Sequence, residues 1–198
     1  MEFQEVVRRR RMIRRYRSDP IPEDAVERIV SAILRGPTGG FSQGIDVIVI
    51  TTPEMRQRVV EALSDEPEPS DPKLVAPLQL IITVDEERYH RRYNEPDKLA
   101  ITGGKEVFWP VPYWHIDAGA AMMLALLAAV DEGLAAGFYG HPDQEARLQR
   151  VLGIPASIVP IGVITVGYDG EGSLSAEARQ RFRTRRRPRS EAVHREQW

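Results

Sequence analysis

Arginines near the start of the chain could bind a phosphate group. Arg10-Arg11-Met12-Ile13-Arg14 belongs to a run that holds seven arginines between positions 8 and 17. A planar guanidinium can donate two parallel hydrogen bonds to a phosphate, which suits this anion better than a single ammonium does. On a helix, Arg10 and Arg14 would share one face. Spacing alone also allows a solvated basic face, which is the usual role of a charge run.

A second segment with chemical potential runs from Gly36 to Gly44 and reads GPTGGFSQG. Its glycines would let backbone N–H groups approach a ligand. Thr38, Ser42 and Gln43 could hydrogen-bond sugar-like hydroxyl groups or the polar edge of a ring. A plain surface turn between a helix and a strand is the alternative.

A third segment, residues 133–140, reads GLAAGFYG and could bring its backbone close to a planar ring at Gly137. A helix end followed by a turn explains the same glycines. The aromatic residues Trp109, Tyr113 and Trp114 could stack on a ring or fill an interface. The pattern does not decide between these two roles.

Composition excludes several kinds of redox centre. The chain has no cysteine, so disulfides, iron–sulfur clusters, zinc–thiolate sites and cysteine nucleophiles are ruled out. The histidines are scattered without metal-ligand spacing at positions 90, 115, 141 and 194. We therefore expect no metal site, and any redox chemistry would come from an organic cofactor.

Length and charge favour a cytoplasmic protein of one domain. The 198 residues fit a single domain, which we place at residues 1–198. The apolar stretch from Ala118 to Val130 is shorter than the roughly 20 residues needed to cross a bilayer, so we expect no membrane partner. A net charge of -2 and pI near 6.1 argue against a nucleic-acid-binding protein, although both ends of the chain are rich in arginine.

Hydrophobic periodicity predicts a mixture of helices and strands without strict alternation, which indicates an α+β layer fold. Residues 64–72 read as an exposed loop and residues 94–112 as an irregular segment that covers a site. Helices are predicted at 2–13, 23–34, 53–63, 85–93, 113–136 and 143–152, and strands at 46–51, 78–84 and 158–166.

The predicted helix over residues 113–136 is apolar on nearly every face. Such a helix must be buried all round, in a core or against a second subunit.

The order and spacing of these segments resemble the FMN-dependent nitroreductase superfamily over most of the chain, from about Val6 to Trp198. The matching pieces are the arginine segment with Tyr16, then Asp19-Pro-Ile-Pro22, Pro37-Thr38 through Gln43, Asp117 through Leu127, Leu152-Gly-Ile-Pro155, Pro160 through Tyr168, and Arg186-Arg187-Pro188. Each piece is weakly specific, and their conjunction in order carries the resemblance.

This resemblance implies a three-layer sandwich with a mostly antiparallel central sheet, and a long central helix at the interface of a homodimer. It implies FMN as cofactor, NADH or NADPH as hydride donor, and a nitroaromatic, quinone or similar small acceptor in a ping-pong cycle. The residues expected to bind the cofactor are Arg10, Arg11, Arg14, Arg185, Arg186 and Arg187 at the phosphate, Thr38, Ser42 and Gln43 at the ribityl chain or ring, and Gly137 beside the ring. No catalytic side chain is assigned, and residues 175–198 are expected to extend over the partner subunit.

Some positions depart from the family pattern. Met12 replaces a serine, which removes one hydrogen bond; Phe41 replaces an asparagine; and Gly44-Ile45 replaces a Pro-Trp pair. The pattern also leaves the residue that stabilises the reduced flavin unidentified. Dehalogenation, flavin fragmentation, ene reduction on the same fold, and a flavin-free binding protein stay open as alternatives.

Overall fold

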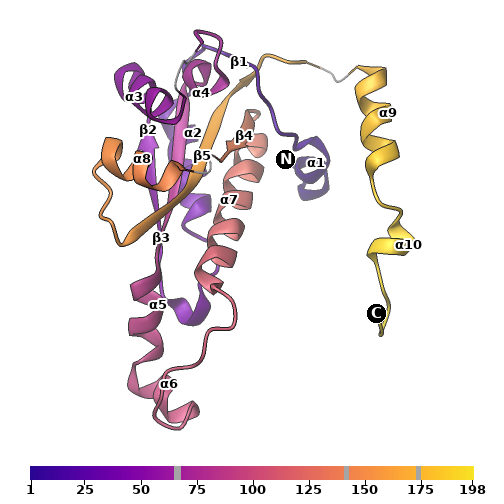
Figure 1. The fold of residues 1–198 in the computed structure, drawn as a ribbon. Helices are drawn as coiled ribbons and strands as arrows, with labels where there is room; N and C mark the ends of the chain where they lie inside the picture. Colours follow the sequence, from indigo (N-terminus) through magenta and orange to yellow (C-terminus); the bar gives the residue numbers. More distant parts are fainter. Residues whose placement is uncertain (65–67, 141–142, 173–174) are drawn as a thin grey trace.

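The computed structural model describes residues 1–64, 68–140, 143–172 and 175–198. Its centre is a five-stranded sheet with the order β1-β5-β3-β2, in which β4 also pairs with β5 (Figure 1). All the paired strands are antiparallel. The strands are β1 (Tyr16–Arg17), β2 (Ile45–Ile50), β3 (Leu78–Asp85), β4 (Ala135–Tyr139) and β5 (Ile158–Asp169). The helices are α1 (Phe3–Arg9), α2 (Glu23–Ile33), η1 (Gly39–Phe41), α3 (Pro53–Leu63), α4 (Pro72–Val75), α5 (Glu86–Tyr93), α6 (Pro96–Ile101), α7 (Tyr113–Asp131), α8 (Gln144–Leu152), α9 (Ala176–Arg185) and α10 (Arg189–Ala192).

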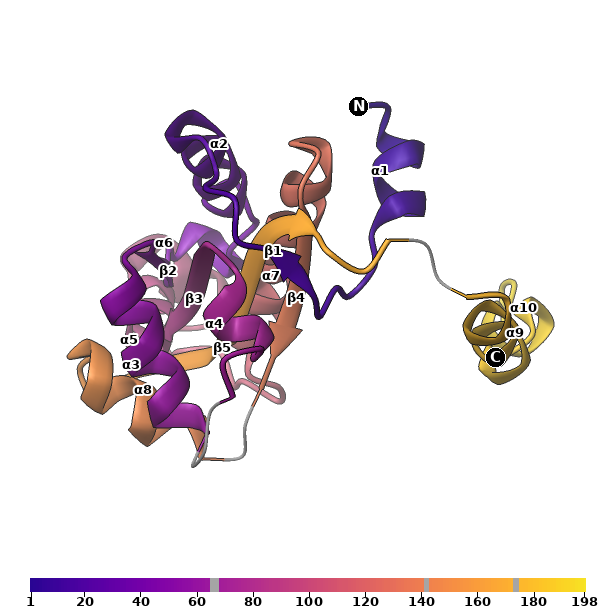
Figure 2. The same ribbon diagram turned by 90° about the horizontal axis from the view of Figure 1, so that it is seen from above.

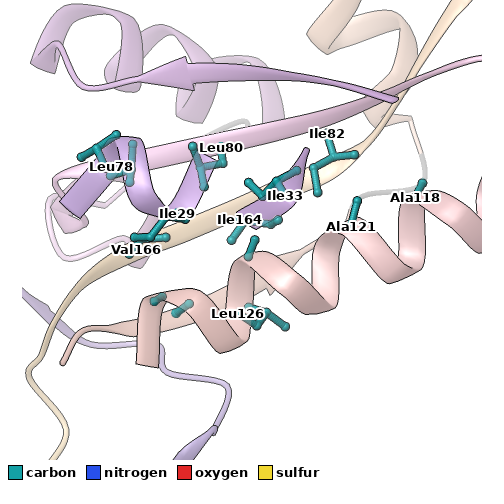
Figure 3. Close-up of a cluster of buried hydrophobic side chains, with 14 of the residues drawn as sticks. Ile29, Ile33, Leu78, Leu80, Ile82, Ala118, Ala121, Leu126, Ile164 and Val166 are labelled. Atoms are coloured by element: carbon teal, nitrogen blue, oxygen red, sulfur yellow. The ribbon is translucent and has the colours of Figure 1, made fainter. Parts of the chain in front are cut away.

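Helices cover both faces of the sheet, which gives the expected layered α+β fold (Figures 1 and 2). Side chains alternate along β3, so that Leu80 and Ile82 pack toward α2 and α7 while Ile81 packs toward α3 and α8. Figure 3 shows the first of these cores, in which α2 and α7 meet the sheet. Side chains of both cores are almost wholly inaccessible to water, so hydrophobic burial on two faces stabilises the sheet.

The local sequence explains where several elements begin and end. Helix α2 begins directly after Pro22 and has Glu23 and Asp24 in its first turn, where acidic side chains favour the helix dipole. Helix α8 ends at Gly153, which has a left-handed φ of 67° that suits glycine. Most of the predicted helices and strands over residues 23–93 and 143–166 are confirmed within a few residues.

One prediction in the arginine segment is wrong. Helix α1 ends at Arg9, and Arg10 to Ile13 continue as extended chain rather than helix. The Ile13 N–H donates to the Ala136 carbonyl at 3.0 Å, and the Ile13 side chain is 2% exposed. Pairing with the sheet edge and burial of Ile13 therefore outweigh helix formation here. Arg10 and Arg14 consequently do not share a helix face.

A second correction concerns the helix predicted to reach residue 136. Helix α7 ends at Asp131, and Gly133 turns the chain with a φ of 74°. The next residues form β4, which pairs along the free edge of β5. Two alanines in β4 supplied no strand signal, and β-sheet pairing overrides their helix preference. Strand β1 and helix α6 were also not predicted.

The C-terminal tail stands away from the rest of the chain in both views (Figures 1 and 2). All of its residues from 179 onward are exposed, including Trp198 at 99%. Two predictions fall partly outside the described residues. The predicted loop at 64–72 includes residues 65–67, and the predicted scatter of the histidines includes His141; the structure describes neither.

Helix α7 is long and apolar enough to cross a membrane by length and composition alone. Its Ala118, Ala125 and Leu126 are completely buried against α2 and the sheet, so α7 is a core helix of this domain. The opposite face carries apolar side chains that the described part of the chain leaves exposed. Ile116 is 55% exposed and Met123 is 42% exposed.

Strand β4 and the N-terminal segment cross with almost no space between them, and this crossing makes a stability prediction. A Cβ on Gly137 would lie 2.4 Å from the Ile13 carbonyl oxygen, so Gly137→Ala forces the backbone to move. We expect a loss of about 1–3 kcal/mol in the free energy of unfolding, measured by chemical denaturation.

Gly140→Ala is the matched control, because a Cβ there first meets the Gln144 side chain at 3.7 Å. Its stability should stay within about 0.5 kcal/mol of the original. Equal stability of the two variants would contradict the crossing.

Candidate functional site

Two cations gather around the ring of Tyr139 at the end of β4. The Arg14 guanidinium carbon lies 5.5 Å from the ring centroid, and the Lys73 ammonium lies 5.2 Å from it. Both distances are within the range of cation–π attraction. Side chains from the N-terminal segment, from α4 and from β4 thus meet at one place on the sheet edge.

The N-terminal segment is held beside β4 by buried hydrogen bonds. The Tyr16 hydroxyl donates to the Ile13 carbonyl at 2.9 Å and lies 2.8 Å from the Thr165 hydroxyl on β5. Burial raises the pKa of Tyr16 far above its ordinary value, so the hydroxyl stays protonated. The Arg14 N–H donates to the Glu171 carboxylate beyond β5. The backbone on either side of Arg14 is therefore fixed.

The arginines of this segment differ in whether a carboxylate already neutralises them. Arg8 and Arg9 both pair with Glu5 on the same helix. Arg11 pairs with Asp169 at 2.7 Å and also donates to the Gly172 carbonyl at 3.0 Å.

The guanidinium groups of Arg10 and Arg14 have no carboxylate partner among the residues that the structure describes. Within the N-terminal part of the predicted phosphate site their charges remain available to an anion, whereas Arg11 is committed to Asp169.

Lys73 is a further candidate site residue, which the sequence pattern did not assign. Its ammonium pairs with the Asp71 carboxylate at 2.8 Å, and only 14% of the Lys73 side chain is exposed. The ammonium has three donors, of which this pair uses one. Lys73 directly follows the stretch 64–72, which reads as an exposed loop, and its half-buried position on α4 is what identifies it.

Tyr139 places a polar atom at the same site. Its hydroxyl oxygen is buried and has no hydrogen-bond partner among the described residues. Burial raises the pKa of this phenol to about 12, so it is a neutral donor at physiological pH. A buried donor without an acceptor is costly and points to a missing ligand or water.

The glycine-rich segment at 36–44 is a strained loop. Phe41 and Gln43 have positive φ values of 60° and 55°, which are uncommon for residues with a side chain. The loop is braced from two sides: Asp117 of α7 accepts from the Gly39 N–H at 2.8 Å, and Arg92 of α5 donates to the Gly40 carbonyl at 2.9 Å. Backbone strain held in place in this way is common at ligand sites.

The three predicted side chains of this loop are oriented differently. Ser42 is buried and donates to the Gly39 carbonyl within the loop. Thr38 accepts from the Gln43 N–H at 3.1 Å, while the Gln43 side chain is exposed. Thr38 and Gln43 line a small cavity of about 30 Å³ together with Ala121 of α7.

Within one chain, this loop and the arginines lie at opposite ends of α7. Arg11 and Ile13 line a cavity of about 350 Å³ that reaches Val130, nine residues beyond Ala121. Nine residues extend about 13 Å along a helix axis. Within one chain, Gln43 therefore lies far from Arg11 and Ile13.

The predicted cofactor residues of the tail lie apart from Arg10 and Arg14, whereas Gly137 lies against Ile13. Arg185, Arg186 and Arg187 are exposed in the tail, which stands away from the body (Figure 1). The missing side chain of Gly137 makes room for the Ile13 carbonyl. The structure thus assigns Gly137 to the crossing of two chain segments.

The segment at 94–112 is tied down by Glu106. This carboxylate lies 2.5 Å from His90 Nδ1 on α5 and accepts from Trp109 Nε1 and from Asn94 Nδ2, each at 2.8 Å. Trp109 in turn contacts the ring of Trp114 at a centroid distance of 5.8 Å. The aromatic cluster therefore packs the covering segment onto α5 and α7.

Comparison with known proteins decides the family. Residues 7–168 match the sequence model of the nitroreductase family. The chain belongs to the nitroreductase family.

Relatives of this nitroreductase-family protein align with most of its length. It is 28% identical to an NADH dehydrogenase/NAD(P)H nitroreductase of Archaeoglobus fulgidus, which spans 96% of this chain and 94% of the relative. An FMN reductase [NAD(P)H] of Bacillus subtilis is 25% identical and spans 82% of this chain and 64% of the relative. The solved structure of an FMN-dependent nitroreductase from Clostridium difficile superimposes with a TM-score of 0.72 at 17% identity and spans 98% of each chain.

Membership makes this nitroreductase-family protein an oxidoreductase of the flavin reductase type, and the names of its relatives include both FMN and NAD(P)H.

The His90–Glu106 contact in this nitroreductase-family protein makes a prediction about pH. The hydrogen bond to Glu106 raises the pKa of His90 above its ordinary 6.5, with Glu86 adding to the effect. Burial of the Glu106 carboxylate acts to raise its pKa. Hydrogen bonds from Trp109, His90 and Asn94 outweigh burial and hold the pKa of Glu106 below its ordinary value.

A raised pKa means that the stabilisation is fully present below pH 6.5 and is lost as the pH rises through the pKa of His90 in the folded protein. The difference in melting temperature between the original protein and His90→Gln should be largest in mild acid and should shrink with rising pH. A difference that grows with pH would contradict the ion pair.

Proposed function

We propose that this protein is an FMN-dependent NAD(P)H oxidoreductase that passes electrons to a small acceptor such as a nitroaromatic compound or a quinone. The observation that carries the proposal is the Arg14 guanidinium, which has no carboxylate partner among the described residues, beside the half-buried Lys73 at the Tyr139 ring of a nitroreductase-family chain. The names of relatives that include FMN and NAD(P)H support it.

The residues present fit an FMN phosphate. A phosphomonoester offers several acceptor oxygens and close to two negative charges, and Arg10 and Arg14 offer donors that no described carboxylate uses. Helix α1 and the crossing at Gly137 hold the backbone of these arginines before any ligand arrives. Preorganised donors of this kind lower the cost of binding.

The residues present also fit a flavin ring. We propose that Lys73 would hold the edge of the ring at which negative charge accumulates on reduction. Its ammonium keeps donors beyond the one given to Asp71, and its low exposure strengthens the electrostatic effect. Thr38 and Gln43 would contact the ribityl chain or the ring, and the Tyr139 hydroxyl would gain an acceptor.

Bound FMN supplies the hydride chemistry between NADH or NADPH and the acceptor. The chain's own contribution is to grip the phosphate with Arg10 and Arg14, to neutralise the ring edge with Lys73, and to present the strained loop with Thr38 and Gln43. Tyr139 keeps its proton because its pKa is raised to about 12. A cytoplasmic location and the ping-pong order belong to this proposal.

We further propose that the site is completed by a second copy of the chain. The loop at 38–43 and the arginines lie at opposite ends of α7, so a partner that packs antiparallel against α7 would bring one chain's loop to the other chain's arginines. The exposed apolar face of α7 supports such packing. The detached tail with Arg185, Arg186 and Arg187 would then lie over the partner (Figure 2).

The phosphate assignment is tested with Arg14→Ala. We expect FMN to bind roughly ten- to a hundredfold more weakly, because one charge-assisted hydrogen bond contributes about 1.5–3 kcal/mol. Fluorescence titration of the flavin measures the change.

Arg15→Ala is the control for lost positive charge, since Arg15 is exposed and adjacent. Its FMN affinity should stay close to the original. The original protein loaded with FMN should bleach with NADH or NADPH without oxygen and regain its colour with a quinone. Equal affinities for the two variants, or no bleaching by either donor, would count against the proposed function.

The dimer is tested at Met123. Light scattering should give about twice the chain mass of 22.4 kDa for the original protein and a value near 22.4 kDa for Met123→Glu. A carboxylate in an apolar contact loses its hydration without a partner, and this cost opposes association.

Ala146→Glu adds the same charge on α8, in the layer on the other side of the sheet, and should leave the dimer intact. A monomeric original protein at working concentration would remove the proposed interface.

A further inference from the structure

Helix α4, which carries Lys73, cannot hold its own shape. It spans only Pro72–Val75, and a single helical turn is unstable in isolation. Its backbone carbonyls are instead bound by side chains from two other elements. Arg56 of α3 donates to the Leu74 carbonyl at 2.9 Å and to the Ala76 carbonyl at 2.6 Å. Gln79 of β3 donates to the Lys73 carbonyl at 2.5 Å.

Gln79 is an unusual residue for its position. Its side chain is completely buried, and its neighbours along β3 are Leu78 and Leu80. The side-chain carbonyl of Gln79 has no hydrogen-bond partner among the described residues, and the same is true of Arg56 Nε.

An apolar residue would serve the core better at both positions, because a buried polar atom without a partner lowers stability. Burial also lowers the pKa of Arg56, which reflects the cost of keeping this charge out of water. The hydrogen bonds that Arg56 and Gln79 donate to the carbonyls of residues 73, 74 and 76 fix the backbone of this segment.

This fixed backbone decides where the Lys73 ammonium stands. The ammonium is held on one side by Asp71 at 2.8 Å, and the Asp71 side chain is itself tied to the Lys73 N–H at 2.8 Å. The local pair therefore moves with α4 as a unit. Among the described residues, the side chains of Arg56 and Gln79 bind the carbonyls of residues 73, 74 and 76 and so connect this unit to α3 and the sheet.

We propose that Gln79 and Arg56 are positioning residues, which hold α4 so that the Lys73 ammonium faces the flavin ring. This inference rests on the proposed function, because it takes Lys73 as the cation that stabilises reduced FMN. Neither side chain touches the flavin, and each acts through the backbone of α4.

Gln79→Leu tests the inference, because leucine keeps the buried volume and removes the bond to Lys73. In the flavin-free protein, hydrogen exchange at the Leu74 and Val75 amides should become roughly five- to tenfold faster. In the FMN-loaded protein, the midpoint potential of the flavin should become more negative, in the same direction as in Lys73→Gln. The double variant should show no further shift beyond Lys73→Gln, since both changes remove one interaction.

Gln57→Leu is the matched control. Gln57 lies on α3 and donates to Glu61 rather than to α4, so the same substitution there should change neither exchange nor potential. Arg56→Met provides a second route to the same loosening of α4 and should reproduce the exchange and potential shifts if Gln79→Leu folds poorly.

The outcomes separate the two proposals. Two results would overturn the positioning role alone. The first is an unchanged rate of hydrogen exchange at the Leu74 and Val75 amides in Gln79→Leu. The second is a flavin midpoint potential that changes in Lys73→Gln but stays at the original value in Gln79→Leu. If Lys73→Gln leaves the flavin midpoint potential unchanged, or if the original protein binds no FMN, the assignment of Lys73 is wrong and this inference is wrong with it.

Discussion

The N-terminal segment crosses strand β4 at Gly137, and the place of the cations follows from that contact. The Ile13 carbonyl occupies the space where a side chain on residue 137 would stand, and Tyr16 locks the crossing to Thr165. Arg14 directly follows Ile13 in the chain, and its guanidinium lies near the Tyr139 ring. Gly137 therefore lets the N-terminal segment come close enough to β4 for Arg14 to lie over the Tyr139 ring.

Sequence patterns predicted the elements whose side chains repeat with a clear period. Helix α2 and strands β3 and β5 were predicted because one face, or the whole strand, is apolar. The arginine segment was misread as a continuous helix, because arginine favours helices and the pairing of Ile13 with Ala136 is a contact across more than a hundred residues. Nothing local to residues 10–14 signals it.

The candidate site divides in the same way. Arg10, Arg14, Thr38 and Gln43 could be named from residue type and from their order along the chain. Lys73 could not, because its place depends on buried side chains of α3 and β3 that no motif marks. Arg11 has the right type, yet Asp169 neutralises it. Whether a cation is free for a ligand is a property of its partners, and those partners are distant in sequence.

The single chain is incomplete in two independent respects. Helix α7 leaves Ile116 and Met123 exposed on an apolar face, and the loop with Gln43 lies far from the arginines along that same helix. One event, the packing of a second α7 on this face, would resolve both. Hydrophobic burial would then drive assembly, and assembly would complete the site.

Binding of FMN compared with riboflavin tests the central claim most directly, because the two ligands differ only in the phosphate. The account predicts that the original protein binds FMN at least roughly a hundredfold more tightly, and that the advantage falls as salt screens the arginines. Equal affinity for the two ligands at low salt would contradict it, since Arg10 and Arg14 would then have no anion to hold.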